Sequence, residues 1–241
     1  MFAMNVRKSI WDLRCRMALG RRMRTAVANL RSVITRRGVI EAYLRSNPVA
    51  KVQVGCGSNL LANWFNTDLV AGPGVTFVNA VKPLPFPASA LNYVFTEHMF
   101  EHISYVAGQK FLREVYRVLK PGGIVRVSTP ELAFLMRLYS DSQSDLIRRY
   151  CEYVAETFLP EPRVRTRCAV VNNFFYNWGH CFIYDFETLE HTLTAAGFVD
   201  VRRFKPKQSD DPYLRNLESH GKVIGEEFNA LETIVVQARK P

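Results

Sequence analysis

Apolar and polar positions follow two different patterns along this chain of 241 residues. In residues 1–48 the apolar positions recur at close to the 3.6-residue period of an α-helix, and most arginines lie off that stripe. Gly20 and Gly38 predict breaks in the pattern, and Asn47-Pro48 predicts its end. The segment is therefore predicted to be a basic amphipathic helix or a pair of helices. Its apolar positions are Ile10, Leu13, Met17, Met23, Val27, Leu30 and Ile34.

After this segment, short β-branched and aromatic runs alternate with helical ones. The clearest helix is predicted over 104–119, where Phe111 and Val115 recur at helical spacing before Pro121-Gly122-Gly123 ends it. Such alternation predicts an α/β fold with a mostly parallel sheet that is covered on both faces. Strands are predicted at residues 51–55, 64–68, 75–79, 91–97, 123–129, 199–204 and 232–239.

Residues 131–187 interrupt the alternation with a helical stretch and an aromatic run that includes Trp178. We expect this segment to form a small cap, or substrate insert, over the active edge of the sheet. A helix is predicted over 186–196, and the last two strands are predicted to pair antiparallel and close the sheet. The chain is thus divided into a helical extension, residues 1–48, and one domain, residues 49–241, which carries the insert.

The net charge of +10 is concentrated at the start of the chain. Eleven of the 32 Lys and Arg residues, but only two of the 22 Asp and Glu residues, lie in residues 1–48, so the remaining domain is close to neutral. A neutral domain lacks a basic nucleic-acid footprint, and we expect no nucleic-acid partner. For residues 1–48 three interpretations stay open: a helix packed on the domain with a solvated basic face, a helix that contacts an anionic membrane surface or partner, and an arginine-rich organellar leader.

The five cysteines are widely spaced and form no Cys-x-x-Cys pair, which argues against a zinc site of cysteines and against a disulfide framework. No stretch approaches the ~20 apolar residues that a membrane-spanning helix needs, and the start of the chain lacks the apolar core of a secretion signal. We therefore expect a cytoplasmic protein, with residues 1–48 as the candidate for peripheral contact with the inner membrane face.

The predicted strand Val52–Val54 leads directly into the turn Gly55-Cys56-Gly57. Glycine lets the backbone turn tightly and approach a ligand closely. In an open α/β sheet the first such turn lies where ligands bind, although a lone Gly-x-Gly is also found in simple turns. A dinucleotide fingerprint would need a glycine in place of Leu60, and the turn lacks the Gly-Lys-Ser/Thr of a phosphate-binding loop.

Four further features follow this turn in order. Together with the turn they resemble the class I S-adenosylmethionine-dependent methyltransferases, and among these the type 11-like small-molecule group. The resemblance covers residues 50–130 and, more loosely, residues 179–204 and 232–240. It implies a Rossmann-like fold with a mostly parallel seven-stranded sheet and an antiparallel terminal strand. The four features are Asp68 at the end of the second strand, Leu84-Pro85-Phe86, the segment 93–102 with its Phe100-Glu101-His102 triplet, and Pro121-Gly122-Gly123.

The resemblance implies S-adenosyl-L-methionine as the cofactor. Gly55 and Gly57 would lie under its methionine moiety, and Asp68 would accept hydrogen bonds from its ribose hydroxyls. Asn79 stands where the family often has an acid that binds the adenine amino group. Because Asp68 follows Gly57 by only 11 residues, the first helix must be short or replaced by a loop. The residues assigned to the cofactor are Val54, Gly55, Cys56, Gly57, Asp68, Leu69, Asn79, Ala80, Thr96, Glu97 and His98.

Candidates for acceptor chemistry are found after the fourth strand and beyond the insert. If the acceptor is a hydroxyl, a base must remove its proton, and an imidazole that titrates near neutral pH suits that role. His180 and His102 are the candidate bases, although His102 could instead anchor the start of the following helix. We see no local metal-ligand pattern, so no metal is predicted. The candidates for acceptor binding are Glu101, Asn172, Asn173 and Tyr184.

The sequence therefore predicts a methyltransferase that uses S-adenosylmethionine and modifies a small molecule, lipid or saccharide, with O-methylation as the reaction. An alternative is a non-catalytic binding or scaffold protein that retains the fold. Neutral side chains at Gln53, Asn79 and Asn92, where the family usually has acids, support that alternative. An enzyme that modifies RNA or protein is a third interpretation, and it depends only on the charge of residues 1–48.

Overall fold

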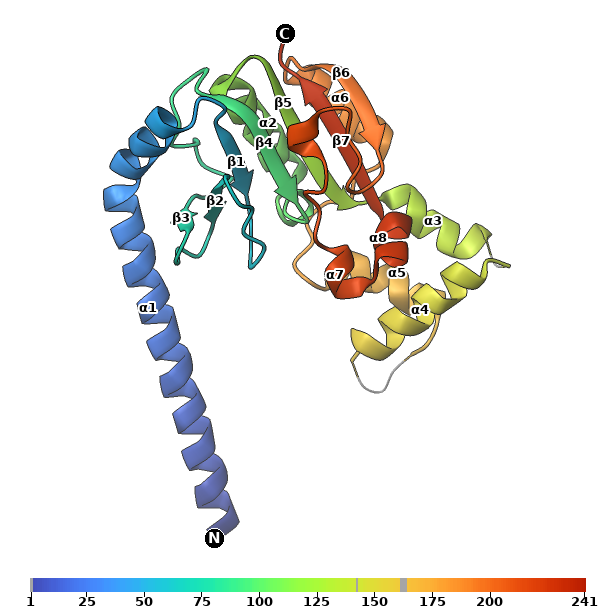
Figure 1. Ribbon diagram of the computed structural model, residues 1–241. Coiled ribbons are helices and arrows are strands. Elements are labelled where there is room, and N and C mark those ends of the chain that lie inside the picture. The colour runs from blue at the N-terminus through green and yellow to red at the C-terminus, as the bar shows by residue number, and fades with distance from the viewer. Residues whose placement is uncertain (1, 142, 161–163) are drawn as a thin grey trace.

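A seven-stranded sheet forms the centre of the molecule, with the strand order β3-β2-β1-β4-β5-β7-β6 (Figure 1). The computed structural model describes residues 2–141, 143–160 and 164–241, and it describes side chains from residue 22 onward. Strands β1 to β5 are parallel, and β7 runs antiparallel to β5 and β6, as predicted. The strands are β1 (Lys51–Val54), β2 (Phe65–Asp68), β3 (Val75–Phe77), β4 (Leu91–Glu97), β5 (Leu119–Pro130), β6 (Val199–Phe204) and β7 (Thr233–Arg239).

The long helices lie at the start of the chain, after β4 and in the predicted insert. The helical stretch predicted at the start of the insert consists of two helices. Ser144 caps the second of them, because its side chain accepts a hydrogen bond from the Ile147 N–H. The helices are α1 (Phe2–Ser46), α2 (Tyr105–Val118), α3 (Leu132–Ser140), α4 (Asp145–Thr157), α5 (Arg167–Tyr176), α6 (Phe186–Ala195), α7 (Gly221–Ile224) and α8 (Glu226–Glu232), with 3-10 turns η1 (Phe100–His102) and η2 (Pro212–Leu214).

Strand β5 starts earlier than predicted, at Leu119. Leu119 pairs with Leu91, and Ile124 pairs with Tyr93. The chain therefore advances by five residues on β5 but by only two on β4, and β5 bulges at this point. Gly122 takes a φ of +77° in the bulge, a conformation that glycine adopts readily. Pro121-Gly122-Gly123 therefore forms an irregularity within the strand and does not simply precede it.

Among the described residues, the long helices that pack on the sheet lie on one of its faces. Apolar side chains of β1, β4, β5 and β7 pack there against α2, α6 and the end of α1, and α2 lies behind the sheet in Figure 1. The segments that join β1 to β2, β2 to β3 and β3 to β4 are fully described and contain no helix. The short spacing between Gly57 and Asp68 leaves room only for a loop there, as expected. The prediction that alternating helices cover both faces is wrong for this half of the sheet.

Residues 205–224, which lead from β6 toward β7, cover the other face. Leu214 and Leu217 pack with Phe95, Ile124 and Trp64 in a separate apolar cluster. This segment crosses in front of the sheet in Figure 1 and replaces the missing helices.

A buried ion pair attaches this covering segment to the sheet. Arg126 of β5 and Glu218 are both buried, and the Arg126 Nε–H donates to Glu218 Oε1 across 2.6 Å. Glu218 Oε2 accepts from the Lys207 N–H, and Arg126 Nη1 donates to the Gln208 carbonyl. Since every one of these bonds joins the sheet to the segment or the segment to itself, the pair fixes where residues 205–224 lie.

Helix α1 is continuous through Gly20 and Gly38, so the predicted breaks are wrong. A glycine inside a helix costs only about 1 kcal/mol relative to alanine, which the rest of the helix tolerates. The predicted end is confirmed, because the helix stops at Ser46. The side chains of the first predicted apolar positions, Ile10, Leu13 and Met17, lie outside the described residues.

The second half of α1 packs along the edge of the sheet. Ile40 is buried, and the Tyr43 hydroxyl donates to the Lys51 carbonyl and accepts from the Lys51 N–H. Ser32 Oγ accepts from the N–H of Phe77 on β3, the outermost strand. The helix thereby covers an exposed strand edge that would otherwise be free to pair with another chain. Its first half leaves the sheet (Figure 1).

Helices α3, α4 and α5 of the predicted insert form a second apolar core together with α8. Phe134, Tyr150, Phe174 and Phe228 meet there nearly edge to face. Because α3 follows β5 directly, this core lies beyond the carboxyl end of the parallel strands.

Removing one member of the buried ion pair should be costly. We expect Glu218→Ala to lower the free energy of unfolding by about 3–5 kcal/mol, because Arg126 would be left buried without its partner. Urea denaturation measures the change. Asp210→Ala, which breaks the exposed pair with Arg202, is the matched control and should change stability little. Equal effects of the two substitutions would contradict this account of the covering segment.

Candidate functional site

A cavity of about 580 Å³ opens at the carboxyl ends of β1 to β4. The strand order reverses between β1 and β4, which is where open α/β sheets bind ligands. We call it the first cavity. Its lining residues are Val54, Gly55, Gly57, Asp68, Leu69, Val78, Asn79, Ala80, Val81, His98, Met99, His102 and Ile103.

The glycine turn after β1 is shaped by two different constraints. Gly55 and Gly57 have φ values of +74° and +52°, in the region that favours glycine. A Cβ on Gly55 would lie 2.4 Å from Met99 Cγ, whereas a Cβ on Gly57 would meet nothing within 4 Å. Gly55 is therefore required for packing as well as for conformation, and Gly57 leaves open space above the turn. The N–H groups of Gly55 and Cys56 both donate to the Thr67 carbonyl, which ties the turn to β2.

Asp68 lies at the end of β2 with both carboxylate oxygens oriented by the backbone. Oδ2 accepts from the Gly57 N–H at 2.8 Å, and Oδ1 accepts from the Val70 N–H at 3.2 Å. Each oxygen keeps a further lone pair for a ligand. Asn79, after β3, accepts from the Val81 N–H through Oδ1 and lines the same cavity.

Three residues assigned to the cofactor do not line the first cavity: Cys56, Thr96 and Glu97. Side chains alternate along a strand, so Thr96 points into the helix-covered face, and Glu97 points to the opposite face and accepts from the N–H groups of Ser219 and His220. Cys56 is buried, and burial together with the charge of Asp68 raises the pKa of its thiol to about 11. Four apolar residues that line the cavity were not among the predicted site residues: Val78, Val81, Met99 and Ile103.

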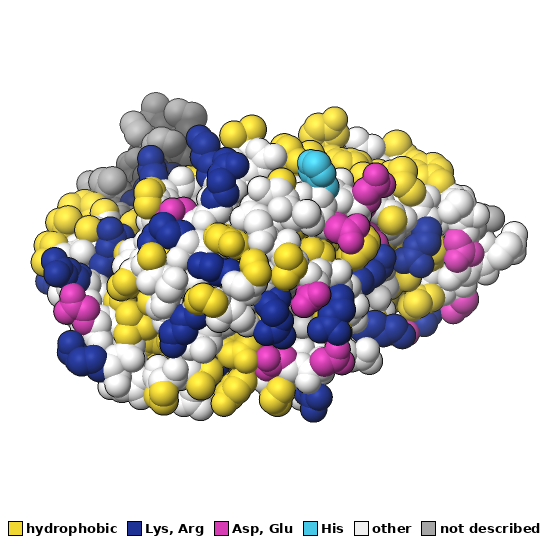
Figure 2. All heavy atoms as spheres, turned by 90° about the horizontal axis from the view of Figure 1, so that it is seen from above, with side chains coloured by type: hydrophobic (Ala, Val, Ile, Leu, Met, Phe, Trp, Pro, Cys, Tyr) yellow, Lys and Arg dark blue, Asp and Glu magenta, His cyan; other side chains and the backbone are white. Residues whose placement is uncertain are grey.

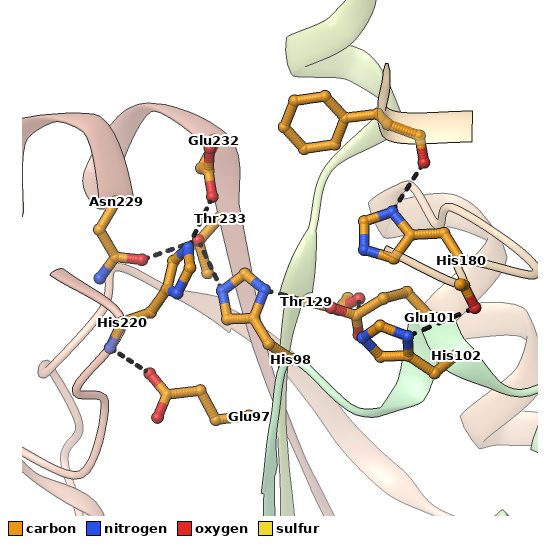
Figure 3. Close-up of polar contacts among 12 residues, drawn as sticks. Glu97, His98, Glu101, His102, Thr129, His180, His220, Asn229, Glu232 and Thr233 are labelled. Carbon is orange, nitrogen blue, oxygen red and sulfur yellow. Dashed lines mark hydrogen bonds and ion pairs between the residues drawn. The ribbon is translucent and has the colours of Figure 1, made fainter. Parts of the chain in front are cut away.

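A second cavity, of about 230 Å³, adjoins the first below the helices of the insert. His98 and His102 line both cavities, so the two share a border. Four histidines from three parts of the chain line this cavity, and in Figure 3 they form two pairs, His98 with His220 and His102 with His180. The lining residues are His98, Glu101, His102, Pro130, Phe158, Phe174, Trp178, His180, His220, Val223, Ile224 and Glu232.

Glu101 is fully buried beneath this border and holds His98 in place. Its Oε1 lies 3.1 Å from His98 Nδ1, and its Oε2 accepts from the Thr129 hydroxyl at 3.0 Å. Burial disfavours both charged forms, but the hydrogen bond between the two groups and their opposite charges outweigh it. The pKa of His98 is accordingly raised and the pKa of Glu101 is lowered. Glu101 therefore supports the cavity wall from below.

His180 has one nitrogen committed and one free to accept a proton. Its Nδ1 lies 2.7 Å from the Phe174 carbonyl, which can only accept, so Nδ1 carries the hydrogen and Nε2 keeps its lone pair. Burial lowers the pKa of the His180 imidazole, which favours this neutral form. The rings of His180 and His102 lie 5.0 Å apart.

His102 is exposed and faces His180 across the cavity, with Nδ1 3.3 Å from the Gly179 carbonyl. It does not cap the following helix: Ser104 is the N-cap of α2 and accepts from the Ala107 N–H. The alternative role of His102 as a helix anchor is therefore wrong.

Three predicted acceptor residues lie away from both cavities. Asn172 and Asn173 are on α5 and not in a loop, so their side chains bond within the helix and to its end, Asn172 to the Cys168 carbonyl and Asn173 to the Asn177 amide. Tyr184 is fully buried, stacked on Phe100 in the core.

The other half of the histidine cluster includes residues that the sequence analysis did not single out. His220 Nε2 lies 3.1 Å from Glu232 Oε1, and the rings of His220 and His98 lie 3.9 Å apart. Donor atoms of His98, His220 and Glu232 lie within 4.8 Å of one another, as do those of Glu101, His102 and His180. No local sequence pattern identifies His220 or Glu232. They lie 12 residues apart, before α7 and at the end of α8, and only the fold brings them next to His98.

Comparison with known proteins gives one family match. Residues 52–127 match the family model described as a methyltransferase domain. No curated protein matches the chain. The matched residues hold β1 to β4, most of β5 and every lining residue of the first cavity.

Solved methyltransferase structures are similar to this chain at low identity. An S-adenosylmethionine-dependent methyltransferase from Archaeoglobus fulgidus is 17% identical, with a TM-score of 0.48, and the match covers 88% of this chain and 94% of that one. A methyltransferase from Thermotoga maritima, titled a possible histamine N-methyltransferase, is 16% identical with a TM-score of 0.46, covering 90% and 97%.

Phosphoethanolamine N-methyltransferase 2 from Haemonchus contortus, solved with S-adenosylhomocysteine, is 17% identical with a TM-score of 0.43, and the match covers 80% of this chain and 49% of that one. All three TM-scores lie below 0.5, so the family assignment rests on residues 52–127. Residues 52–127 therefore form a methyltransferase domain, and the lining residues of the first cavity lie inside it.

Proposed function

We propose that this methyltransferase binds S-adenosylmethionine in the first cavity and methylates a hydroxyl of a small-molecule, lipid or saccharide acceptor that enters the second cavity. The observation that carries the proposal is the shared border at His98 and His102. A methyl donor on one side of this border and an acceptor on the other would be held in contact, and such positioning is the main contribution a protein makes to group transfer.

The residues of the first cavity suit this cofactor. The open space above Gly57 admits a ligand against the backbone, and the free lone pairs of Asp68 can accept hydrogen bonds from two neighbouring hydroxyls. The apolar side chains of Val78, Val81 and Leu69 would flank an adenine ring beside Asn79. When bound, the cofactor supplies a methyl group already activated by its sulfonium.

His180 is the proposed general base. Its Nε2 can accept the proton of an acceptor hydroxyl, while its Nδ1–H bond to Phe174 keeps the ring oriented. The aromatic side chains of Phe158, Phe174 and Trp178 line the same cavity and would pack against the face of a ring or a short apolar group. We therefore expect an acceptor that presents one ring or head group to this space.

Two of the three neutral side chains that supported the alternative of a non-catalytic scaffold lie away from the first cavity. Gln53 is buried and does not line the first cavity, and Asn92 Oδ1 accepts from the Ala50 N–H and from Lys120 Nζ, which is a structural role. Only Asn79 lies where a ligand would meet it. The third interpretation, an enzyme acting on RNA or protein, depends only on the charge of residues 1–48. On the face of the molecule drawn in Figure 2, basic side chains are mixed with acidic and hydrophobic ones.

We also propose that α1 contacts an anionic membrane surface. Met23, Val27, Leu30 and Ile34 are exposed and spaced so that they form one stripe. At 100° per residue this stripe faces away from the side that packs on the sheet, with Arg31 and Arg37 beside it, so apolar and basic side chains are presented together on the outer side of the helix. No helix within the described parts of the chain has both the length and the apolar composition needed to cross a bilayer.

Asp68→Ala should weaken binding of S-adenosylhomocysteine by about 1.5–3 kcal/mol, because hydrogen bonds to a charged acceptor are lost. Isothermal titration calorimetry measures the affinity. The matched control is Asp200→Ala, an exposed carboxylate on β6 that should leave the affinity unchanged. Equal affinity of Asp68→Ala and the wild type would contradict the proposed ribose contact.

His180→Gln should lower turnover by about 100-fold with the affinity for S-adenosylhomocysteine unchanged, since the base acts only on the acceptor. In the wild type, the acid limb of the pH–rate profile should lie below pH 6.5, because burial lowers the pKa of this imidazole and protonation inactivates it. The exposed His191 provides the control substitution. A turnover that His180→Gln leaves intact would remove His180 from the mechanism.

Sedimentation with vesicles should show the full-length protein binding anionic but not neutral lipid, and binding should weaken as salt rises. Replacing Leu30 and Ile34 by Gln should reduce binding, because both side chains are exposed on the stripe. The control replaces Leu60 and Val106, which are exposed elsewhere and line neither cavity. Similar losses in both variants, or binding to neutral vesicles alone, would argue against a membrane role of α1.

A further inference from the structure

The geometry points to a binding site for one divalent transition-metal ion in the second cavity, with His98 Nε2, His220 Nε2 and Glu232 Oε1 as its ligands. This inference goes beyond the methyl transfer proposed above and does not depend on the identity of the acceptor. It also differs from the sequence analysis, which predicted no metal. Three observations support it: the three donor atoms lie close together, hydrogen bonds hold the residues that carry them, and all three residues line the second cavity.

The three donors converge from separate elements. His98 follows β4, His220 immediately precedes α7, and Glu232 ends α8. Their ligand atoms lie within 4.8 Å of one another, so small side-chain rotations would bring all three to the ~2.0–2.2 Å at which imidazole nitrogen and carboxylate oxygen bind zinc. Two imidazoles and one carboxylate favour first-row transition metals over Mg²⁺ or Ca²⁺, which prefer oxygen ligands.

His98 has the support expected of a metal ligand. Its Nδ1 is bonded to the buried carboxylate of Glu101, which leaves Nε2 directed at the other two donors (Figure 3). A carboxylate behind a ligating histidine fixes the ring and makes it a stronger ligand. The only polar contact of Nε2 among the described residues is a long one, 3.4 Å to the Thr233 hydroxyl, which an ion could replace.

The other two donors are also held by their neighbours. The backbone N–H of His220 donates to Glu97 Oε1 at 2.9 Å, which fixes the start of α7. The second carboxylate oxygen of Glu232 accepts from the Tyr150 hydroxyl, and Oε1 faces His220 Nε2 at 3.1 Å, a contact between two members of the group that an ion between them would replace. A site whose ligands are oriented before the ion arrives loses little entropy on binding.

An ion at this place would keep an open coordination position. His98, His220 and Glu232 all line the second cavity, and three protein ligands with one free position are typical of catalytic rather than structural metal sites. An acceptor oxygen could bind there, and a bound metal ion lowers the pKa of such an oxygen. The site would thus orient the acceptor on the side of the cavity opposite His180.

The second group of three, Glu101, His102 and His180, suits a metal less well. Both carboxylate oxygens of Glu101 are bonded to residues outside this group, His98 and Thr129, so an ion would have to break one of these bonds. In the first group, by contrast, the contact that an ion would replace joins two of its own ligands, His220 and Glu232. We therefore assign the ion to the first group alone.

The test uses the full-length protein after removal of metals by chelation. Titration with Co²⁺, followed by its visible absorption, and competition with Zn²⁺ in calorimetry should show one bound ion per chain. His220→Ala and Glu232→Gln should each abolish this binding. Glu101→Gln should weaken it by about 10–100-fold, the effect usual for a residue behind a ligand.

Two further variants separate this proposal from the alternatives. His191→Ala is the matched control on an exposed surface, and His180→Ala, outside the assigned group, should also retain metal affinity. Absence of stoichiometric Co²⁺ binding in the wild type, retention of it in both His220→Ala and Glu232→Gln, or its loss in His180→Ala would overturn the assignment. Circular dichroism checks that each variant is folded. Affinity for S-adenosylhomocysteine, measured in parallel, distinguishes a failed metal site from a failed cofactor site.

Discussion

The carboxylate of Glu97, at the last position of β4, connects the two halves of the candidate site. It accepts hydrogen bonds from the backbone N–H groups of Ser219 and His220 and from the Ser219 hydroxyl. With the ion pair of Arg126 and Glu218 it attaches an irregular segment to a face of the sheet that carries no helix. That segment delivers His220, Val223 and Ile224 to the second cavity, so these carboxylates position one wall of the cavity.

The opposite wall of the site depends on the N-terminal helix. Asn29 of α1 donates to the Leu69 carbonyl and accepts from the Ala71 N–H, so it holds both ends of the loop that follows Asp68. A helix that resembles an appendage in the sequence thereby supports the backbone of Leu69, which lines the first cavity. Its outer face remains free of the sheet, which allows one element to serve the site on one side and a surface on the other.

Much of this arrangement could be predicted because it depends on local patterns. The glycine turn and Asp68 lie at the cavity, since the ends of neighbouring parallel strands must meet. The two-residue period of a strand could also have shown that Thr96 and Glu97 cannot both face a ligand. In contrast, His220 and Glu232 come from a segment without periodicity, and only the return of the chain across the sheet brings them to His98. Asn172 and Asn173, predicted to bind the acceptor, lie within α5, where their side chains bond to neighbouring turns of the chain.

The border between the cavities has a consequence for how ligands bind. His98 and His102 are wall residues of both spaces, so a ligand that moves or neutralises either ring alters the other space as well. Thermodynamic linkage then requires reciprocity: whatever factor the donor contributes to acceptor affinity, the acceptor contributes to donor affinity. Acceptors would thus differ partly in how much each one raises the affinity of the enzyme for the donor. The affinity for an acceptor measured without the donor would leave this contribution to selectivity out.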